Sequence, residues 1–116
     1  MNRTILVTGA SKGIGRAIAV RLARDKFSIV VHYGQDKAGA EETLQAVKDA
    51  GSDGRLITFD ISDRALCRST LEQDIAEYGI YRGIVLNAGI ARDNAFPAME
   101  DNDWDEVMST NLDGFL

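Results

Sequence analysis

Several residue types are scarce in this chain of 116 residues, and each scarcity excludes a kind of protein. The single cysteine, Cys67, has no partner for an intrachain disulfide, so a reducing compartment and a cytoplasmic location are expected. Cys67 falls on the apolar stripe of an expected helix, where a free cysteine behaves as a small hydrophobe. The single histidine, His32, has no further ligands at metal-binding spacing, so no metal site is expected and His32 is predicted to be structural.

Basic residues and long apolar runs are also few. Lys and Arg number 13 against 18 Asp and Glu, which disfavours nucleic acid as a partner because clustered basic side chains bind phosphate backbones. No apolar run approaches the roughly 20 residues of a membrane span. The N-terminus also lacks the pattern of a secretory signal, so no membrane association is expected. Without linkers, repeats or low-complexity tracts, residues 1–116 are predicted to form one domain.

What the chain does contain is an alternation of apolar, β-branched segments with segments of helical periodicity. This alternation predicts an α/β fold built from βαβ units with right-handed crossovers, and a doubly wound parallel sheet in the strand order 3-2-1-4. Successive helices are expected to go to opposite faces at the switch point between the first and fourth strands. Ile14, Ile18 and Leu22 recur at helical spacing, and Ala17, Ala19 and Ala23 provide close-packing faces, so the first helix is expected to be amphipathic and to cover one face of the sheet. The expected strands are 5–7, 27–31, 55–59 and 83–86, and the first two expected helices are 13–25 and 36–50. A third helix is expected after the third strand, capped by Asp60 or Ser62. Its apolar face, with residues at helical spacing, consists of Cys67, Leu71, Ile75 and Tyr78.

A glycine-rich bend joins the first expected strand to the first expected helix. Gly9 suits a tight turn, Gly13 leaves room for a pyrophosphate, and Gly15 lets the helix lie close to the strand. The unpaired N–H groups at the start of a helix favour an anionic ligand, so this bend predicts a phosphate cradle. Glycines also occur in turns and helix starts for structural reasons alone. The residues expected to bind the phosphates are Gly9, Ser11, Lys12, Gly13, Ile14 and Gly15.

Candidate polar residues follow the other strands at the same edge of the expected sheet. Tyr33 follows the second strand, Asp60 and the Ile61 amide follow the third, and residues 87–89 follow the fourth. Ligands of doubly wound sheets bind at the carboxyl ends of the strands, near the point where the strand order reverses. We therefore expect these residues to bind a dinucleotide together with the cradle, although Asp60 alone is equally compatible with a helix cap.

The end of the second strand indicates which dinucleotide is bound. An acidic residue about 20 positions beyond the cradle receives the ribose 2′-hydroxyl of NAD. Here the strand ends in His32-Tyr33-Gly34, and no carboxylate occurs until Asp36. A 2′-phosphate would meet no fixed repulsion and could pair with Lys12, so NADP is predicted over NAD. The alternative is that Lys12 is an ordinary solvated loop lysine.

Three motifs resemble those of the short-chain dehydrogenase/reductase family: T-G-A-S-K-G-I-G at 8–15, N-A-G at 87–89 and N-L-D-G-F at 111–115. The resemblance implies a Rossmann-type fold in which Asp60 accepts the adenine amino group. It also implies that Asn87, Ala88 and Gly89 lie beside the cofactor ribose, with the Asn87 side chain tying the sheet together. Asn111 would kink its helix and hold a water of the catalytic proton relay. Leu86 departs from the family pattern, which has a first asparagine there.

The run I-A-R-D-N at 90–94 resembles a loop of the 3-oxoacyl-acyl-carrier-protein reductases of that family. This resemblance implies NADPH-dependent reduction of a small-molecule or acyl-carrier-bound carbonyl in fatty-acid biosynthesis, and a homo-oligomer at full length. The family is about twice as long as this chain, and its catalytic serine and tyrosine-x-x-x-lysine would lie beyond Leu116. Tyr33 and Lys37 have that spacing, but they fall at the adenosine end of the expected site.

We therefore expect this chain alone to be inactive, since it lacks a general acid for the carbonyl oxygen. One alternative is a non-catalytic dinucleotide-binding fragment or module. Another is a binder of flavin or S-adenosylmethionine, which fits the cradle but not the combination of Asp60, Asn87 and Asn111.

Overall fold

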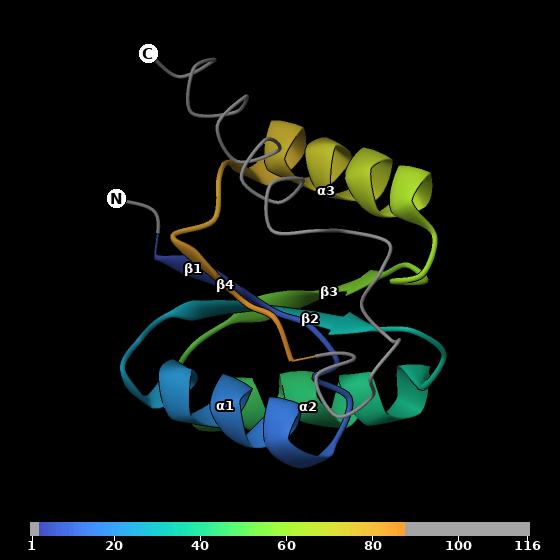
Figure 1. Ribbon diagram of the computed structural model, residues 1–116. Helices are drawn as coiled ribbons and strands as arrows, with labels where there is room; N and C mark the ends of the chain where they lie inside the picture. The colour runs from blue at the N-terminus through green and yellow to red at the C-terminus, as the bar shows by residue number, and fades with distance from the viewer. Residues whose placement is uncertain (1–2, 88–116) are drawn as a thin grey trace.

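The computed structural model describes residues 3–87, which form a parallel sheet between two helical layers (Figure 1). The strand order β3-β2-β1-β4 confirms the predicted doubly wound α/β topology. The helices α1 and α2 cover one face of the sheet and α3 covers the other (Figure 1). The elements are β1 (Thr4–Val7), α1 (Gly13–Arg24), β2 (Ser28–Tyr33), α2 (Lys37–Asp49), β3 (Gly54–Thr58), α3 (Arg64–Tyr78) and β4 (Gly83–Val85).

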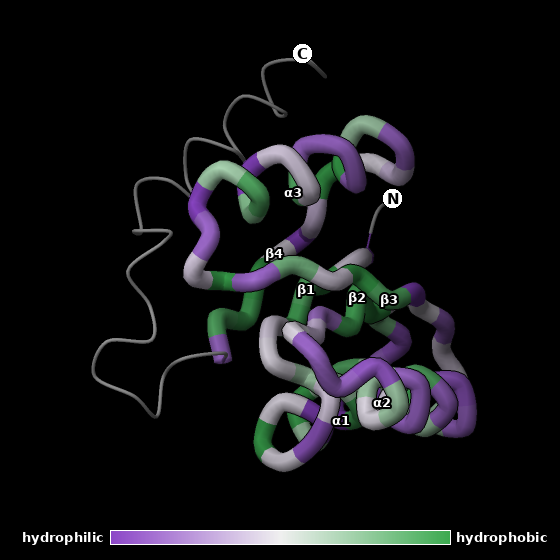
Figure 2. Tube along the Cα trace, turned by 90° about the vertical axis from the view of Figure 1, so that its right-hand side faces the viewer, coloured by the Kyte–Doolittle hydropathy of each residue, from purple (hydrophilic) through white to green (hydrophobic). Residues whose placement is uncertain are grey.

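The strands β1 and β2 form the centre of the sheet and are apolar on both faces. Leu6 and Val30 point into the layer under α3, while Val7 and Val31 point into the layer under α1 and α2. Strands buried on both faces need continuous apolar sequence, and Figure 2 shows them as the hydrophobic centre between helices with polar outer surfaces. All pairs of strands are parallel, so their carboxyl ends, and the loops that follow them, meet at one edge.

The inner face of α1 contains Ala19 and Ala23, two of the three alanines expected to pack closely, while Ala17 and Ile14 are exposed. Ile14 is 73% exposed, whereas the small residues Gly15, Ala19 and Ala23 are buried against the sheet. Ile18 and Leu22 are only partly buried beside them. Small side chains let a helix approach a sheet closely, so α1 turns its glycine and alanine stripe inward and its first isoleucine outward.

The ends of α3 differ from the prediction. Its N-cap is Asp63, whose carboxylate accepts from the Leu66 amide at 3.1 Å, and neither Asp60 nor Ser62 caps the helix. Tyr78 is 55% exposed, and the core position expected for it is taken by Tyr81. The Tyr81 side chain reaches back under α3 and donates to a carboxylate of that helix, which its position just before β4 allows.

Candidate functional site

The site begins at the loop between β1 and α1, here called the cradle loop (residues 8–12). Gly9 and Gly13 have φ angles of 60° and 62°, which lie in the left-handed region that favours glycine. The first backbone bond of α1 runs from the Arg16 amide to the Lys12 carbonyl. The backbone N–H groups of residues 13–15, which come before Arg16 in the first turn of α1, therefore have no intrahelical acceptor. They lie at the positive end of the helix dipole.

Gly13 and Gly15 have opposite surroundings. A Cβ built on Gly15 would overlap the Gly9 carbonyl oxygen and lie 2.8 Å from Asn87 Nδ2. On Gly13 the same atom would meet nothing within 4 Å in the described part of the chain. Gly15 thus allows the helix to approach the strand, and Gly13 faces open space. The close approach predicted at Gly15 is therefore present, and a pyrophosphate at Gly13 stays a prediction.

Asn87 connects the end of β4 to the cradle loop. Its side-chain amide donates to the Gly9 carbonyl at 3.1 Å, and its backbone amide donates to Thr8 Oγ1 at 2.8 Å. The Thr8 hydroxyl in turn donates to the Val85 carbonyl at 3.1 Å. These contacts fix the first turn of the loop against β4, which agrees with the predicted role of the Asn87 side chain in tying the sheet together.

Arg16 supports the other side of the cradle loop, and the sequence analysis did not assign it a role. One guanidinium nitrogen donates to the Ser11 carbonyl and, at 3.0 Å, to the Gly39 carbonyl in α2. Its Nε donates at 2.8 Å to Thr43 Oγ1, and the Thr43 hydroxyl donates to the Ala10 carbonyl at 2.7 Å. The available sequence signal was Thr43, a polar residue among the apolar positions of α2.

A cavity of about 300 Å³ opens beside the cradle loop, between the ends of β2 and β3. Asp60 lies in its wall, and its Oδ1 accepts from the Ser62 hydroxyl at 2.6 Å and the Ser62 amide at 2.9 Å. These hydrogen bonds lower the pKa of Asp60, so the carboxylate is charged and oriented. The cavity is lined by Gly9, His32, Gly34, Gln35, Phe59, Asp60 and Ile61.

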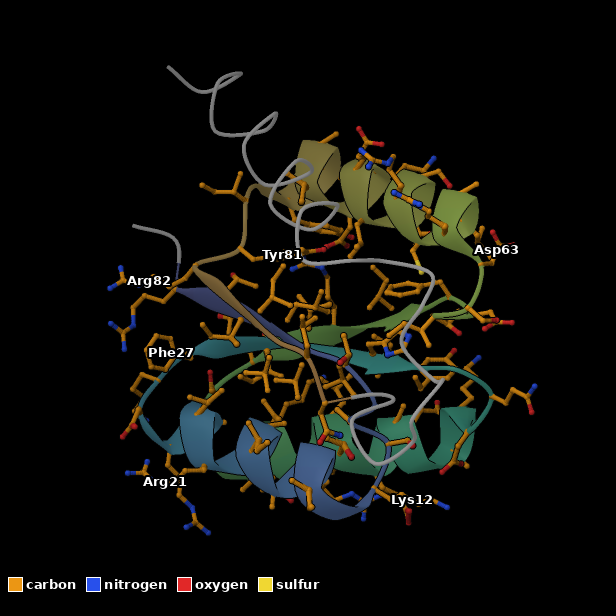
Figure 3. All side chains as sticks on the ribbon, in the orientation of Figure 1. Lys12, Arg21, Phe27, Asp63, Tyr81 and Arg82 are labelled. Atoms are coloured by element: carbon orange, nitrogen blue, oxygen red, sulfur yellow. The ribbon has the colours of Figure 1, made fainter. Side chains whose placement is uncertain are left out.

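The remaining predicted residues have different positions. The Tyr33 side chain packs with the apolar cluster under α1 and α2, and it is absent from the cavity lining. Lys12 is exposed at the start of α1, and within residues 3–87 its side chain makes no cap hydrogen bond. Figure 3 shows Lys12 and Asp63 at the same end of the sheet, opposite Phe27 and Arg82. The predicted residues Ala88, Gly89 and Asn111 and the loop 90–94 lie outside the described residues.

A dinucleotide fits these surroundings. The cradle offers free first-turn amides and open space at Gly13, and the neighbouring cavity offers a charged acceptor at Asp60 for an adenine amino group. No group of three or more His, Cys, Asp or Glu that could hold a metal occurs in the part that the structure describes. None of the described helices has the length and apolar content needed to span a membrane.

Comparison with known proteins decides the family. The family model described as short chain dehydrogenase matches residues 3–116. The chain belongs to the short-chain dehydrogenase family. Members of this family are oxidoreductases that bind nicotinamide dinucleotides. Binding of a dinucleotide is consistent with the cradle loop and the adjoining cavity described above.

Individual relatives agree with this assignment. The 3-oxoacyl-[acyl-carrier-protein] reductase FabG of Aggregatibacter actinomycetemcomitans is 52% identical over 115 residues, which cover 99% of this chain and 48% of that protein. The enzyme of the same name from Staphylococcus aureus (strain Mu50 / ATCC 700699) is 37% identical, covering 98% and 46%. The promiscuous reductase LugOII, which catalyses keto-reduction at C1 during lugdunomycin biosynthesis, has a TM-score of 0.65 at 35% identity, covering 74% and 36%. The chain thus spans about half the length of the curated relatives it matches.

Proposed function

We propose that this chain is the dinucleotide-binding part of an NADPH-dependent carbonyl reductase that reduces 3-oxoacyl groups carried as thioesters, as in fatty-acid biosynthesis. The observation that carries the proposal is the cradle itself. Asn87, Gly15 and Arg16 hold the turn before α1, where a Cβ on Gly13 would face open space and the first helical amides have no intrahelical acceptor. The identity of 52% to a 3-oxoacyl-[acyl-carrier-protein] reductase supports the substrate class.

Different residues of the site would bind different parts of the cofactor. The amides of Gly13, Ile14 and Gly15 would bind the diphosphate, and Asp60 with the Ile61 amide would bind the adenine. Asn87, Ala88 and Gly89 would lie along the ribose, and Asn111 would hold a water of the proton relay. A bound nicotinamide supplies the hydride, while the chain's own residues orient the cofactor at the edge of the sheet.

The preference for NADPH is supported by the charges around the end of β2. The first carboxylate after β2 belongs to Asp36, and its Oδ1 accepts from the Gly39 amide at 2.9 Å as the N-cap of α2. This carboxylate therefore lies beyond the end of β2, where it caps the start of α2. Lys12 is exposed at the cradle and would pair with a 2′-phosphate.

Calorimetric titration of the chain with NADPH and NADH tests this proposal. We expect tighter binding of NADPH, and we expect Lys12→Gln to weaken NADPH binding about 3- to 10-fold while leaving NADH unchanged. Lys48→Gln, which removes a lysine from the last turn of α2, is the matched control. Equal affinities of the unmodified chain for the two nucleotides would contradict the NADPH preference.

The alternative function is a dinucleotide-binding module without catalysis. We expect no oxidation of NADPH by the 116-residue chain with an acetoacetyl thioester, because its sequence provides no tyrosine-x-x-x-lysine at the nicotinamide end. Turnover by this chain would refute that account. A coding sequence that continues beyond residue 116 into a serine and tyrosine-x-x-x-lysine would favour the reductase over the module.

A further inference from the structure

His32 makes two side-chain hydrogen bonds that join the cradle loop to the end of β3. The Gly9 amide donates to His32 Nδ1 at 3.0 Å, and His32 Nε2 lies 3.0 Å from the Phe59 carbonyl oxygen. An amide N–H only donates and a carbonyl oxygen only accepts, so the ring must be neutral with its proton on Nε2. We propose that His32 is a positioning residue that holds the dinucleotide-binding turn in place only as this neutral tautomer.

The backbone of His32 strengthens the same connection. Its carbonyl accepts from the Ala10 amide at 2.9 Å, so one residue binds two consecutive amides of the cradle loop. Those two amides point toward β2 and are not available to a ligand. The loop is thereby directed so that the following amides, at the start of α1, are the ones left for a diphosphate.

The ring has little freedom to adopt another arrangement. His32 is 2% exposed, and its ring packs on that of Phe59 at a centroid distance of 4.2 Å. It also lines the cavity that contains Asp60, the predicted adenine acceptor. A change in the His32 ring would therefore affect both the cradle loop, where the phosphates would bind, and the cavity, where the adenine would bind.

Protonation of His32 would place an N–H at Nδ1 opposite the Gly9 N–H. Two donors cannot share this contact, so either the ring or the turn must move. Burial lowers the pKa of His32, opposed by the hydrogen bond to the Phe59 carbonyl. Between pH 7 and 8 the ring is therefore neutral, and acidification removes the contact. The strand β1 carries no ionisable side chain. The ionisable groups on the other described elements around this end of the sheet are Lys12, Arg16, Tyr33, Asp36, Lys37, Asp60, Asp63, Arg64 and Cys67.

NMR of the chain without ligand tests the geometry directly. We expect the His32 ring nitrogens to show an Nε2-protonated neutral ring at pH 8, and the Gly9 amide resonance to shift at the same pH midpoint as the ring. A ring protonated on Nδ1 at pH 8, or a Gly9 amide that does not respond when His32 titrates, would overturn the proposal. This measurement requires neither a variant nor cofactor binding.

Calorimetric titration with NADP⁺ across the His32 midpoint tests the effect on the site, and this step rests on the proposed function. We expect the Kd of the unmodified chain to rise about tenfold for each pH unit below that midpoint. The control is His32→Asn, whose side-chain oxygen can accept from the Gly9 amide near the position of Nδ1 but does not titrate. The second phosphate ionisation of NADP⁺, near pH 6, affects both proteins and cancels in the ratio of their Kd values.

The outcomes separate the two proposals. A Kd ratio that changes with pH, with tight binding by His32→Asn at low pH, supports His32 as a positioning residue. A constant ratio with tight binding by both proteins overturns the role of His32 and leaves the proposed function intact. Absence of NADP⁺ binding at pH 8 refutes the proposed function, and the NMR measurement then decides the His32 contact by itself.

Discussion

The substitution Gly15→Ala tests whether the cradle depends on close contact between α1 and β1. The new Cβ would overlap the Gly9 carbonyl oxygen and lie 2.9 Å from Ala10 Cα. Both neighbours are backbone atoms, so the turn must move instead of a flexible side chain. Such overpacking costs about 1–3 kcal/mol. Loss of the hydrogen bond from Asn87 to Gly9 would add about 1 kcal/mol.

One term opposes this cost. Alanine is better than glycine inside a helix by about 1 kcal/mol, so the net loss of unfolding free energy is about 1–3 kcal/mol. Urea unfolding followed by far-UV circular dichroism measures this loss. The same variant should bind the dinucleotide more weakly, because the displaced turn carries the amides that bind the phosphates.

Two further glycines provide the comparison. Gly34→Ala places its Cβ where nothing described lies within 4 Å, and it should leave stability unchanged or raise it by up to about 1 kcal/mol. Gly13→Ala also meets open space but requires an alanine at a φ of 62°, which costs about 1–2 kcal/mol. If Gly15→Ala were as stable as Gly34→Ala, the close approach of α1 to β1 would not matter and our account of this glycine would be wrong.

Three other changes test the surrounding structure. Asp74→Asn should lower the free energy of unfolding, measured with urea, by about 2 kcal/mol, because the Asp74 side chain is 9% exposed and pairs with Arg55 at 2.6 Å. The control is Arg21→Gln, which breaks an exposed ion pair worth below about 1 kcal/mol. A loss for Asp74→Asn no greater than that of the control would contradict the prediction. Burial raises the pKa of Cys67 to about 11, so a thiol reagent at pH 8 should modify it only after unfolding, and rapid labelling of the native chain would refute its burial. Asp36→Ala should cost about 1 kcal/mol through loss of the α2 cap, whereas an unchanged urea midpoint would show that the cap is dispensable.

The sequence was sufficient to predict the strand order and the sheet edge at which the described candidate residues meet. Both depend on local signals: continuous β-branched runs, helical periodicity and glycine-rich bends. The assignment of Gly9, Gly13 and Gly15 to turn, open space and close contact was equally a matter of local spacing.

The wrong predictions have a common cause. Which of several side chains takes a buried or a capping position depends on contacts between residues that are distant in sequence. The helical spacing of Ile14 with Ile18 and Leu22 could not show that Ile14, at the very start of α1, would be exposed. Three potential caps lie within four residues before α3, and the backbone conformation there selects Asp63. Arg16 and Thr43, which support the cradle, are 27 positions apart, so the polar Thr43 among apolar positions of α2 gave a signal without showing its partner.

The bond between Asn87 and Gly9 spans 78 positions of the sequence. During synthesis at about 5–20 residues per second, the glycine bend therefore emerges several seconds before the asparagine that fixes it. Nascent chains that end before residue 87 would contain every glycine of the cradle without the contact that closes it. Capture of a nucleotide by nascent chains of increasing length would then mark the moment at which the fourth strand joins the first.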